Sequence, residues 1–68
     1  MTNVAQAQEG LRQVKDYAED GDNERAHIAQ DDLLKFAVQV AAAGAPDAQE
    51  VAHIAMEATQ VKFQRWYA

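Results

Sequence analysis

The 68-residue sequence contains no cysteine, and it has no hydrophobic run long enough to cross a membrane. Without cysteine the chain forms no disulfide bond and offers no thiolate ligand to a metal, so nothing favours an oxidising compartment. A membrane span needs about 20 consecutive apolar residues, and a secretion signal needs a basic segment followed by an apolar one. Neither is found in this sequence. We therefore expect a cytoplasmic protein without a membrane partner.

Basic residues are also few. Six Lys and Arg residues stand against 11 Asp and Glu residues, which gives a formal net charge of −5 and an isoelectric point near 4.7. Because the phosphates of nucleic acids attract clustered Lys and Arg, this balance argues against direct binding to nucleic acid. The acidity is concentrated in residues 16–32, where seven acids stand against Arg25 alone. Such a block suits a basic protein partner, a cation or a solvated surface.

Large hydrophobic side chains are scarce as well. Hydrophobic residues make up 49% of the chain, but 15 of them are alanine and only 13 are Leu, Ile, Val or Phe. A chain of this size forms at most one domain, here residues 1–68, and its core is only marginally sufficient for stability. Since alanine-rich helices approach each other closely, we expect a homodimer that buries further area through alanine-rich faces.

Glycine, proline and capping residues divide the chain into helical segments. The tetrad at residues 20–23, Asp-Gly-Asp-Asn, has the composition of a turn. Gly44 supplies the usual C-terminal stop of a helix, and Pro46 does not easily continue one. Asp47 and Glu50 stand at the spacing of a capping box. The sequence therefore predicts a turn after a first helix, and a short loop between a second and a third.

These signals predict an all-α, three-helix fold. Thr2 or Asn3 is suited to cap the first helix, and Gly10 weakens that helix in its middle, so we expect it to be short or frayed. Only two or three residues separate the second and third helices, which must fold back as an antiparallel hairpin. The first helix packs on this hairpin. The expected helices cover about residues 3–20, 23–43 and 47–67.

An octad of the form Glu-x-x-His-x-x-x-acid occurs twice, at residues 24–31 and 50–57. On a helix it places three potential ligands on one face, and bundles that hold two iron or manganese ions use Glu-x-x-His on two helices. An antiparallel hairpin separates the two histidines by roughly 15 Å along its axis, so only a symmetric dimer joins the octads. Helix capping and ion pairing account for the same residues without a metal. The metal-ligand candidates are Glu24, His27, Asp31, Glu50, His53 and Glu57.

The same hairpin brings the acidic start of the second helix opposite the basic, aromatic end of the third. This corner is interpreted either as a bundle end held by ion pairs or as a protein-binding patch, because Trp, Tyr and Arg are the residues most enriched at binding hot spots. A general acid/base pair at His27 lacks a nucleophile, a phosphate loop and a third orienting group. We therefore predict no enzyme, no catalytic residue and no cofactor. The candidate protein-binding residues are His27, Asp31, Asp32, Arg65, Trp66 and Tyr67.

Three strings of residues carry a likeness to a known family. They are Tyr17-Ala18-Glu19-Asp20-Gly21-Asp22-Asn23-Glu24-Arg25-Ala26-His27, Asp31-Asp32-Leu33-Leu34 and Arg65-Trp66-Tyr67-Ala68. Together they resemble a family of short helical proteins encoded in bacteriophages and prophages. The likeness covers about residues 17–34 and 62–68, with Gln30 where the family usually has alanine. Because that family has no assigned reaction, the resemblance implies a helical fold and a phage-related context but no mechanism.

Three hypotheses for the function follow from these observations. The first is a small acidic phage or prophage protein, located in the host cytoplasm, that binds a basic host protein and inhibits a host or defence function without catalysis. Arg65, Trp66 and Tyr67 then anchor the contact, and the acids of residues 16–32 steer the partner. The second is a metal-binding helical dimer that uses the two octads. The third is a purely structural accessory protein.

Overall fold

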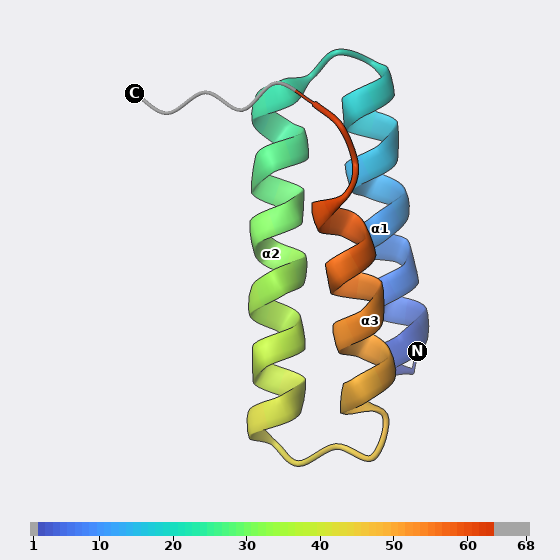
Figure 1. The fold of residues 1–68 in the computed structure, drawn as a ribbon, viewed down its shortest axis with the longest axis vertical. Helices are drawn as coiled ribbons and strands as arrows, with labels where there is room; N and C mark the ends of the chain where they lie inside the picture. The colour runs from blue at the N-terminus through green and yellow to red at the C-terminus, as the bar shows by residue number, and fades with distance from the viewer. Residues whose placement is uncertain (1, 64–68) are drawn as a thin grey trace.

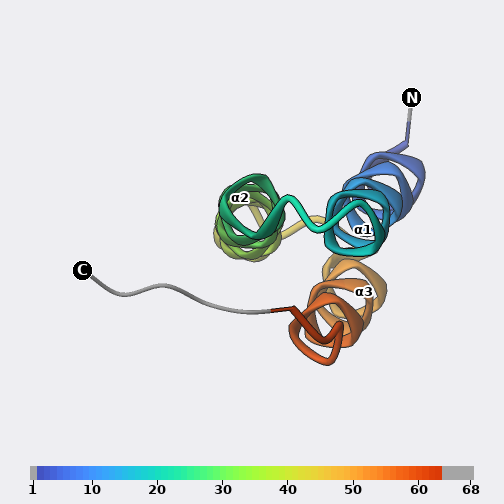
Figure 2. The same ribbon diagram turned by 90° about the horizontal axis from the view of Figure 1, so that it is seen from above.

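Three α-helices, α1 (Asn3–Glu19), α2 (Asn23–Ala42) and α3 (Ala48–Thr59), form the structure, a computed structural model that describes residues 2–63. Because α2 runs antiparallel to α1 and α3, the latter two begin at the same end of the molecule (Figure 1). Viewed along the bundle, the helices stand at the corners of a triangle, and each contacts the other two (Figure 2). The predicted all-α fold is confirmed for these residues, in which no strand occurs.

A glycine in the left-handed conformation follows each of the first two helices. Gly21 has a φ of 77° and Gly44 a φ of 70°, values that residues with a side chain rarely adopt. After α2, the amide of Ala45 donates a hydrogen bond of 3.2 Å to the carbonyl of Val40, which is the Schellman arrangement at a helix end. The same bond pattern follows α1. Both loops, where the chain reverses direction, lie where the sequence predicts a helix to stop.

The first helix is complete, and the prediction that it is short or frayed is wrong. It spans 17 residues, and the hydroxyl of Thr2 caps it by accepting a hydrogen bond of 3.0 Å from the amide of Ala5. Gly10 does not break it, because the missing side chain makes room for Leu33 of α2. A β-carbon placed on Gly10 would lie 3.3 Å from Cδ1 of Leu33. Glycine thus lets α1 and α2 approach closely at a position where it otherwise costs a helix roughly 1 kcal/mol.

The third helix ends at Thr59, so the prediction that it continues through residues 60–63 toward residue 67 is wrong. The amide of Gln60 bonds to the carbonyl of Glu57 and that of Val61 to the carbonyl of Ala58, a spacing of three residues that tightens the last turn. The hydroxyl of Thr59 donates to the carbonyl of Met56 in the same turn. Residues 64–67 of the predicted helix lie outside the described residues.

The start of α3 also differs from the prediction. Asp47 is the N-cap residue, but its side chain makes no hydrogen bond to the backbone of the helix, so the predicted capping box of Asp47 and Glu50 is wrong. Instead, Oδ1 of Asp47 accepts a hydrogen bond of 3.2 Å from Nδ2 of Asn3. Since α1 and α3 begin at the same end of the bundle, this bond ties their N-termini together.

The core between the helices is built from small side chains. Half of the buried hydrophobic residues are alanine, and the single buried polar residue among those described is Gln30. These five alanines are therefore used between the helices of one chain, whereas Ala41, Ala42, Ala43 and Ala52 are exposed, and the predicted dimer through alanine-rich faces stays a prediction. No helix in residues 2–63 combines the length and apolarity needed to cross a membrane. The buried hydrophobic residues are Ala7, Leu11, Val14, Ala26, Leu33, Ala37, Val40, Val51, Ala55 and Ala58.

Candidate functional site

His27 and Asp31 form the predicted pair on one face of α2. Nε2 of His27 lies 3.5 Å from Oδ2 of Asp31, one helical turn further along. Asp31 is exposed, whereas His27 is half-buried. The predicted anchors of the same corner, Arg65, Trp66 and Tyr67, lie outside the described residues. The pair thus forms a small polar site near the start of α2, at the end of the bundle where α3 finishes (Figure 1).

The two octads do not converge. His27 lies in the second turn of α2, and His53 lies in the middle of α3, which runs in the opposite direction. Among residues 2–63, no three His, Asp or Glu side chains come together as a group that could hold a metal ion. Glu24, Glu50, His53 and Glu57 are all exposed. One chain therefore provides no metal centre in the part that the structure describes.

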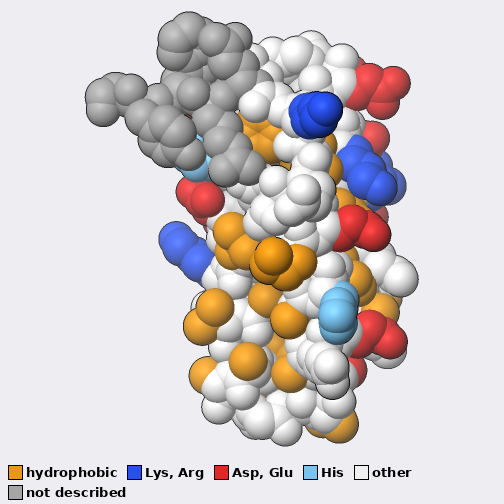
Figure 3. Space-filling view, viewed as in Figure 1, with side chains coloured by type: hydrophobic (Ala, Val, Ile, Leu, Met, Phe, Trp, Pro, Cys, Tyr) orange, Lys and Arg blue, Asp and Glu red, His pale blue; other side chains and the backbone are white. Residues whose placement is uncertain are grey.

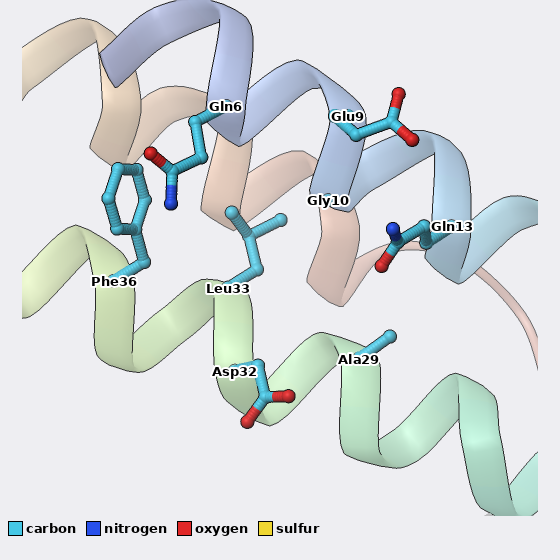
Figure 4. Close-up of a pocket in the computed structure, with 8 residues that line it drawn as sticks. All are labelled: Gln6, Glu9, Gly10, Gln13, Ala29, Asp32, Leu33 and Phe36. Carbon is cyan, nitrogen blue, oxygen red and sulfur yellow. The ribbon is translucent and has the colours of Figure 1, made fainter. Parts of the chain in front are cut away.

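Asp32 lies apart from His27 and Asp31, on the side of α2 that faces α1. There it borders a hollow of about 230 Å³ between the two helices. Leu33 and Phe36 point from α2 into this space and Gln6 and Gln13 point into it from α1, whereas the carboxylates of Glu9 and Asp32 lie at its edges (Figure 4). We call this hollow the α1–α2 groove. Its lining residues are Gln6, Glu9, Gly10, Gln13, Ala29, Asp32, Leu33 and Phe36.

The α1–α2 groove continues toward the loop that joins α1 to α2. A second hollow of about 140 Å³ shares Gln13, Ala29 and Asp32 with it and is completed by other residues of both helices, among them Tyr17 and Arg25. Asp32 thus stands where the two hollows meet. It is exposed, and it makes no ion pair with any residue in the described part of the chain.

Glu9, at the opposite edge of the groove, is held as a carboxylate by a neighbour. Arg12 donates hydrogen bonds to it, including one of 3.0 Å from Nε to Oε2, and also bonds to Asp16 at 2.6 Å. The hydrogen bond from Arg12 lowers the pKa of Glu9 below its ordinary value. The groove therefore has an apolar floor, amide side chains within it and a carboxylate at either edge, of which that of Glu9 is ion-paired with Arg12 and that of Asp32 is not paired with any described residue.

The dimensions of the groove suit part of a protein partner better than a small-molecule ligand. Ligand pockets usually measure about 300–1,000 Å³ and enclose most of the ligand. The α1–α2 groove is smaller and open, and its floor of Ala29, Leu33 and Phe36 is apolar. A lysine or arginine side chain has a long aliphatic stem and a charged end, so its stem fits such a floor while its end reaches the carboxylates.

Sequence reasoning missed a set of exposed hydrophobic side chains. Ile28 is 53% exposed, Val38 68% and Met56 59%. Figure 3 shows hydrophobic side chains gathered over α2 and α3 on the viewed face. The sequence held one signal for them, because Ile28 and Val38 are out of phase with the buried stripe of α2 at Leu33 and Ala37. Exposed large apolar side chains that gather on one face are candidates for contact with another molecule.

Comparisons with known proteins give no match to this chain, whether with family models, with curated proteins or with solved structures. The resemblance to phage and prophage proteins over residues 17–34 and 62–68 accordingly stays a sequence-based prediction. The function is argued below from the α1–α2 groove and from the distribution of charge.

Proposed function

We propose that this chain is a small acidic protein of phage or prophage type that binds a basic protein of its host. It acts in the host cytoplasm without catalysing a reaction, and binding inhibits a host or defence function. The observation that carries the proposal is the α1–α2 groove, whose apolar floor lies between the carboxylates of Glu9 and Asp32. The phage context is supported by the sequence resemblance alone.

A basic helix or loop of the partner supplies the side chain that enters the groove. The stem of its Lys or Arg packs on Leu33 and Phe36, and its charged end lies near Asp32. Asp32 has no ion-pair partner of its own among the described residues, so it is open to such a contact. The net charge of −5 attracts a basic partner over a longer range and speeds the encounter.

Residues outside the groove complete the proposed contact. His27 and Asp31 lie on the neighbouring face of α2, and Arg65, Trp66 and Tyr67 are retained as anchors because of their residue types. An Arg or Trp at the centre of an interface often accounts for more than 1 kcal/mol of binding when it is truncated to alanine, roughly a tenfold change in Kd or more. We propose that the protein binds its partner as a homodimer.

The test compares two charge reversals of equal size. Wild type, Asp32→Lys and Glu57→Lys are immobilised and exposed to lysate of a host bacterium at about 50 mM and about 300 mM salt, where electrostatic contacts differ in screening. Glu57 is an exposed residue of α3 far from the groove in sequence and outside its lining. We expect a basic protein that is captured at low salt by wild type and Glu57→Lys, and that is lost with Asp32→Lys and at high salt.

The captured protein is then purified, and its dissociation constant is measured by calorimetry for each variant and for Trp66→Ala. We expect Asp32→Lys and Trp66→Ala each to weaken binding by tenfold or more, and Glu57→Lys to change it by less than about threefold. If no protein is retained above the blank resin, or if Asp32→Lys retains the same partner as tightly as wild type does, the proposed function is wrong.

A further inference from the structure

The outer side of α2 carries two exposed hydrophobic residues with two opposite charges between them. Ile28, Asp31, Lys35 and Val38 follow one another at spacings of three and four residues, which places them on one face of the helix. All four are exposed, and they lie on the side of α2 opposite its buried residues, such as Leu33. Lys35 forms no ion pair with any residue of the described chain. We call these four residues the α2 face.

The four residues are arranged symmetrically about one level of the helix. Ile28 and Val38 lie five residues before and after residue 33, and Asp31 and Lys35 lie two residues before and after it. At 1.5 Å per residue, the first two are separated by about 15 Å along the axis and the second two by about 6 Å. A two-fold axis that passes beside residue 33 therefore places Ile28 opposite Val38 of an antiparallel copy, and Asp31 opposite Lys35 of that copy. The same axis produces both the apolar and the charged contact.

We propose that this chain forms a two-fold homodimer in which α2 packs antiparallel to α2 of a second copy through the α2 face. In a two-fold interface each pair occurs twice, so the dimer gains two contacts between Ile28 and Val38 and two ion pairs between Asp31 and Lys35. The occupant is a second copy because the face is complementary to itself in both apolarity and charge. This inference does not depend on the proposed host partner, and in the dimer Asp31 pairs with Lys35 of the second copy and leaves the host contact to the α1–α2 groove and its other neighbours.

The charge of the molecule supports the choice of this face. With a net charge of −5, two copies repel one another when acidic surfaces meet. Between Ile28 and Val38 the α2 face holds one acid and one base, and Asp31 also stands 3.5 Å from His27 of its own helix. The exposed Glu24 continues this face one turn before Ile28, so the charge is balanced only around the proposed axis. Ile28 borders the second, smaller hollow of the α1–α2 groove, but none of the four residues lines the main hollow, which stays open in this dimer.

The interface is one helix wide, which limits its strength. Interfaces of this kind fall at or below the small end of the range of specific complexes, about 1,200 Å² of buried surface, and are typically transient. We therefore expect a dissociation constant in the micromolar range, and the dimer to be measured by sedimentation equilibrium of the full chain between about 5 and about 500 µM.

The first test removes the apolar contacts. Ile28→Gln or Val38→Gln is expected to weaken the dimer at least tenfold, since each substitution removes two buried contacts from the pair of chains. Met56→Gln is the matched control, because Met56 is exposed to a similar degree but lies on α3. Since all three side chains are exposed, each variant should keep the helical circular dichroism and the unfolding midpoint of the monomer. Wild type that is monomeric throughout, or a dimer that Val38→Gln leaves unchanged, would overturn the proposal.

The second test uses charge reversal in mixed chains. Asp31→Lys places only lysines at the two charged positions and Lys35→Asp only aspartates, so each variant alone repels its own copy in the dimer. Mixed in equal amounts, the two variants pair lysine with aspartate at every contact and should form a heterodimer at least tenfold tighter than either homodimer. Both variants keep a negative net charge, so unspecific attraction does not produce this result. Failure of the mixture to associate better than its components would count against the α2 face.

Discussion

The side-chain amide of Gln30, in the middle of α2, donates a hydrogen bond of 2.9 Å to the backbone carbonyl of Ala58 in the last turn of α3. Gln30 is only 2% exposed, and the carbonyl of Ala58 also accepts the amide of Val61. A long-range bond within a core of alanine and valine fixes the level at which α3 lies against α2. It also gives a second hydrogen bond to a carbonyl at the point where that helix stops.

We predict that Gln30→Ala lowers the free energy of unfolding by about 2 kcal/mol. The change removes the hydrogen bond, worth about 1 kcal/mol, and leaves a cavity of several heavy atoms in the core. Gln30→Met fills most of the cavity but makes no such bond, so we expect a loss of about 1 kcal/mol. Urea unfolding followed by circular dichroism measures both differences.

The control for this series is Gln39→Ala, the same substitution at an exposed position of α2. It should leave stability within about 0.5 kcal/mol of wild type, because alanine is the better helix former and no buried contact is lost. If Gln30→Ala were no more destabilising than Gln39→Ala, the amide of Gln30 would have no part in holding α3 in place.

The all-α fold and the two loops at which the chain reverses direction could be predicted from the sequence, because both depend on local chemistry. Gly21 and Gly44 stand where a helix must stop in a left-handed conformation, and no tertiary contact is needed to infer it. The end of α3 was missed since no glycine or proline marks it. The burial of Gln30 was missed because a polar residue among alanines indicates a surface position unless the partner across the core is known.

The candidate site was predicted less well than the fold. The block of acids in residues 16–32 indicated a basic partner, but it did not show that Asp32 turns toward α1 while Asp31 turns outward. Neighbouring helical residues differ by about 100° in direction, so a small error in the placement of a helix face moves a side chain to another surface. The groove itself depends on Gly10, whose role became visible only with Leu33 beside it.

A double-mutant cycle decides what Asp47 does. Because its carboxylate accepts a hydrogen bond from Asn3 rather than from the backbone of α3, we expect Asn3→Ala and Asp47→Ala each to destabilise the protein by about 1 kcal/mol. The double variant should lose about 0.5–1 kcal/mol less than the sum of the two, since one shared bond is lost. Urea unfolding of the four proteins gives the coupling. Additive losses would instead indicate that Asp47 and Asn3 act on their own helices.

Gly10 provides a test of how closely α1 and α2 pack. Alanine is favoured over glycine by about 1 kcal/mol within a helix, but its β-carbon would meet Leu33 at 3.3 Å. We therefore expect Gly10→Ala to change stability by less than about 0.5 kcal/mol, and Gly10→Val to destabilise by about 2 kcal/mol because the branched side chain does not fit. Thermal unfolding distinguishes these values from the full gain of about 1 kcal/mol that an unhindered position would show.

The pair of Glu9 and Arg12 predicts a small dependence of stability on pH. Arg12 lowers the pKa of Glu9 in the folded chain, so the pair stabilises the fold above the ordinary pKa of the carboxyl, near 4.5, and the contribution is lost as the pH falls through the lowered value. Both side chains are exposed, and the effect should weaken further in high salt. The unfolding midpoint of wild type should therefore exceed that of Glu9→Gln at neutral pH and approach it in acid. In an Arg12→Gln background, the same change at Glu9 should have little effect at either pH, whereas an unchanged difference would show that Arg12 does not hold the carboxylate.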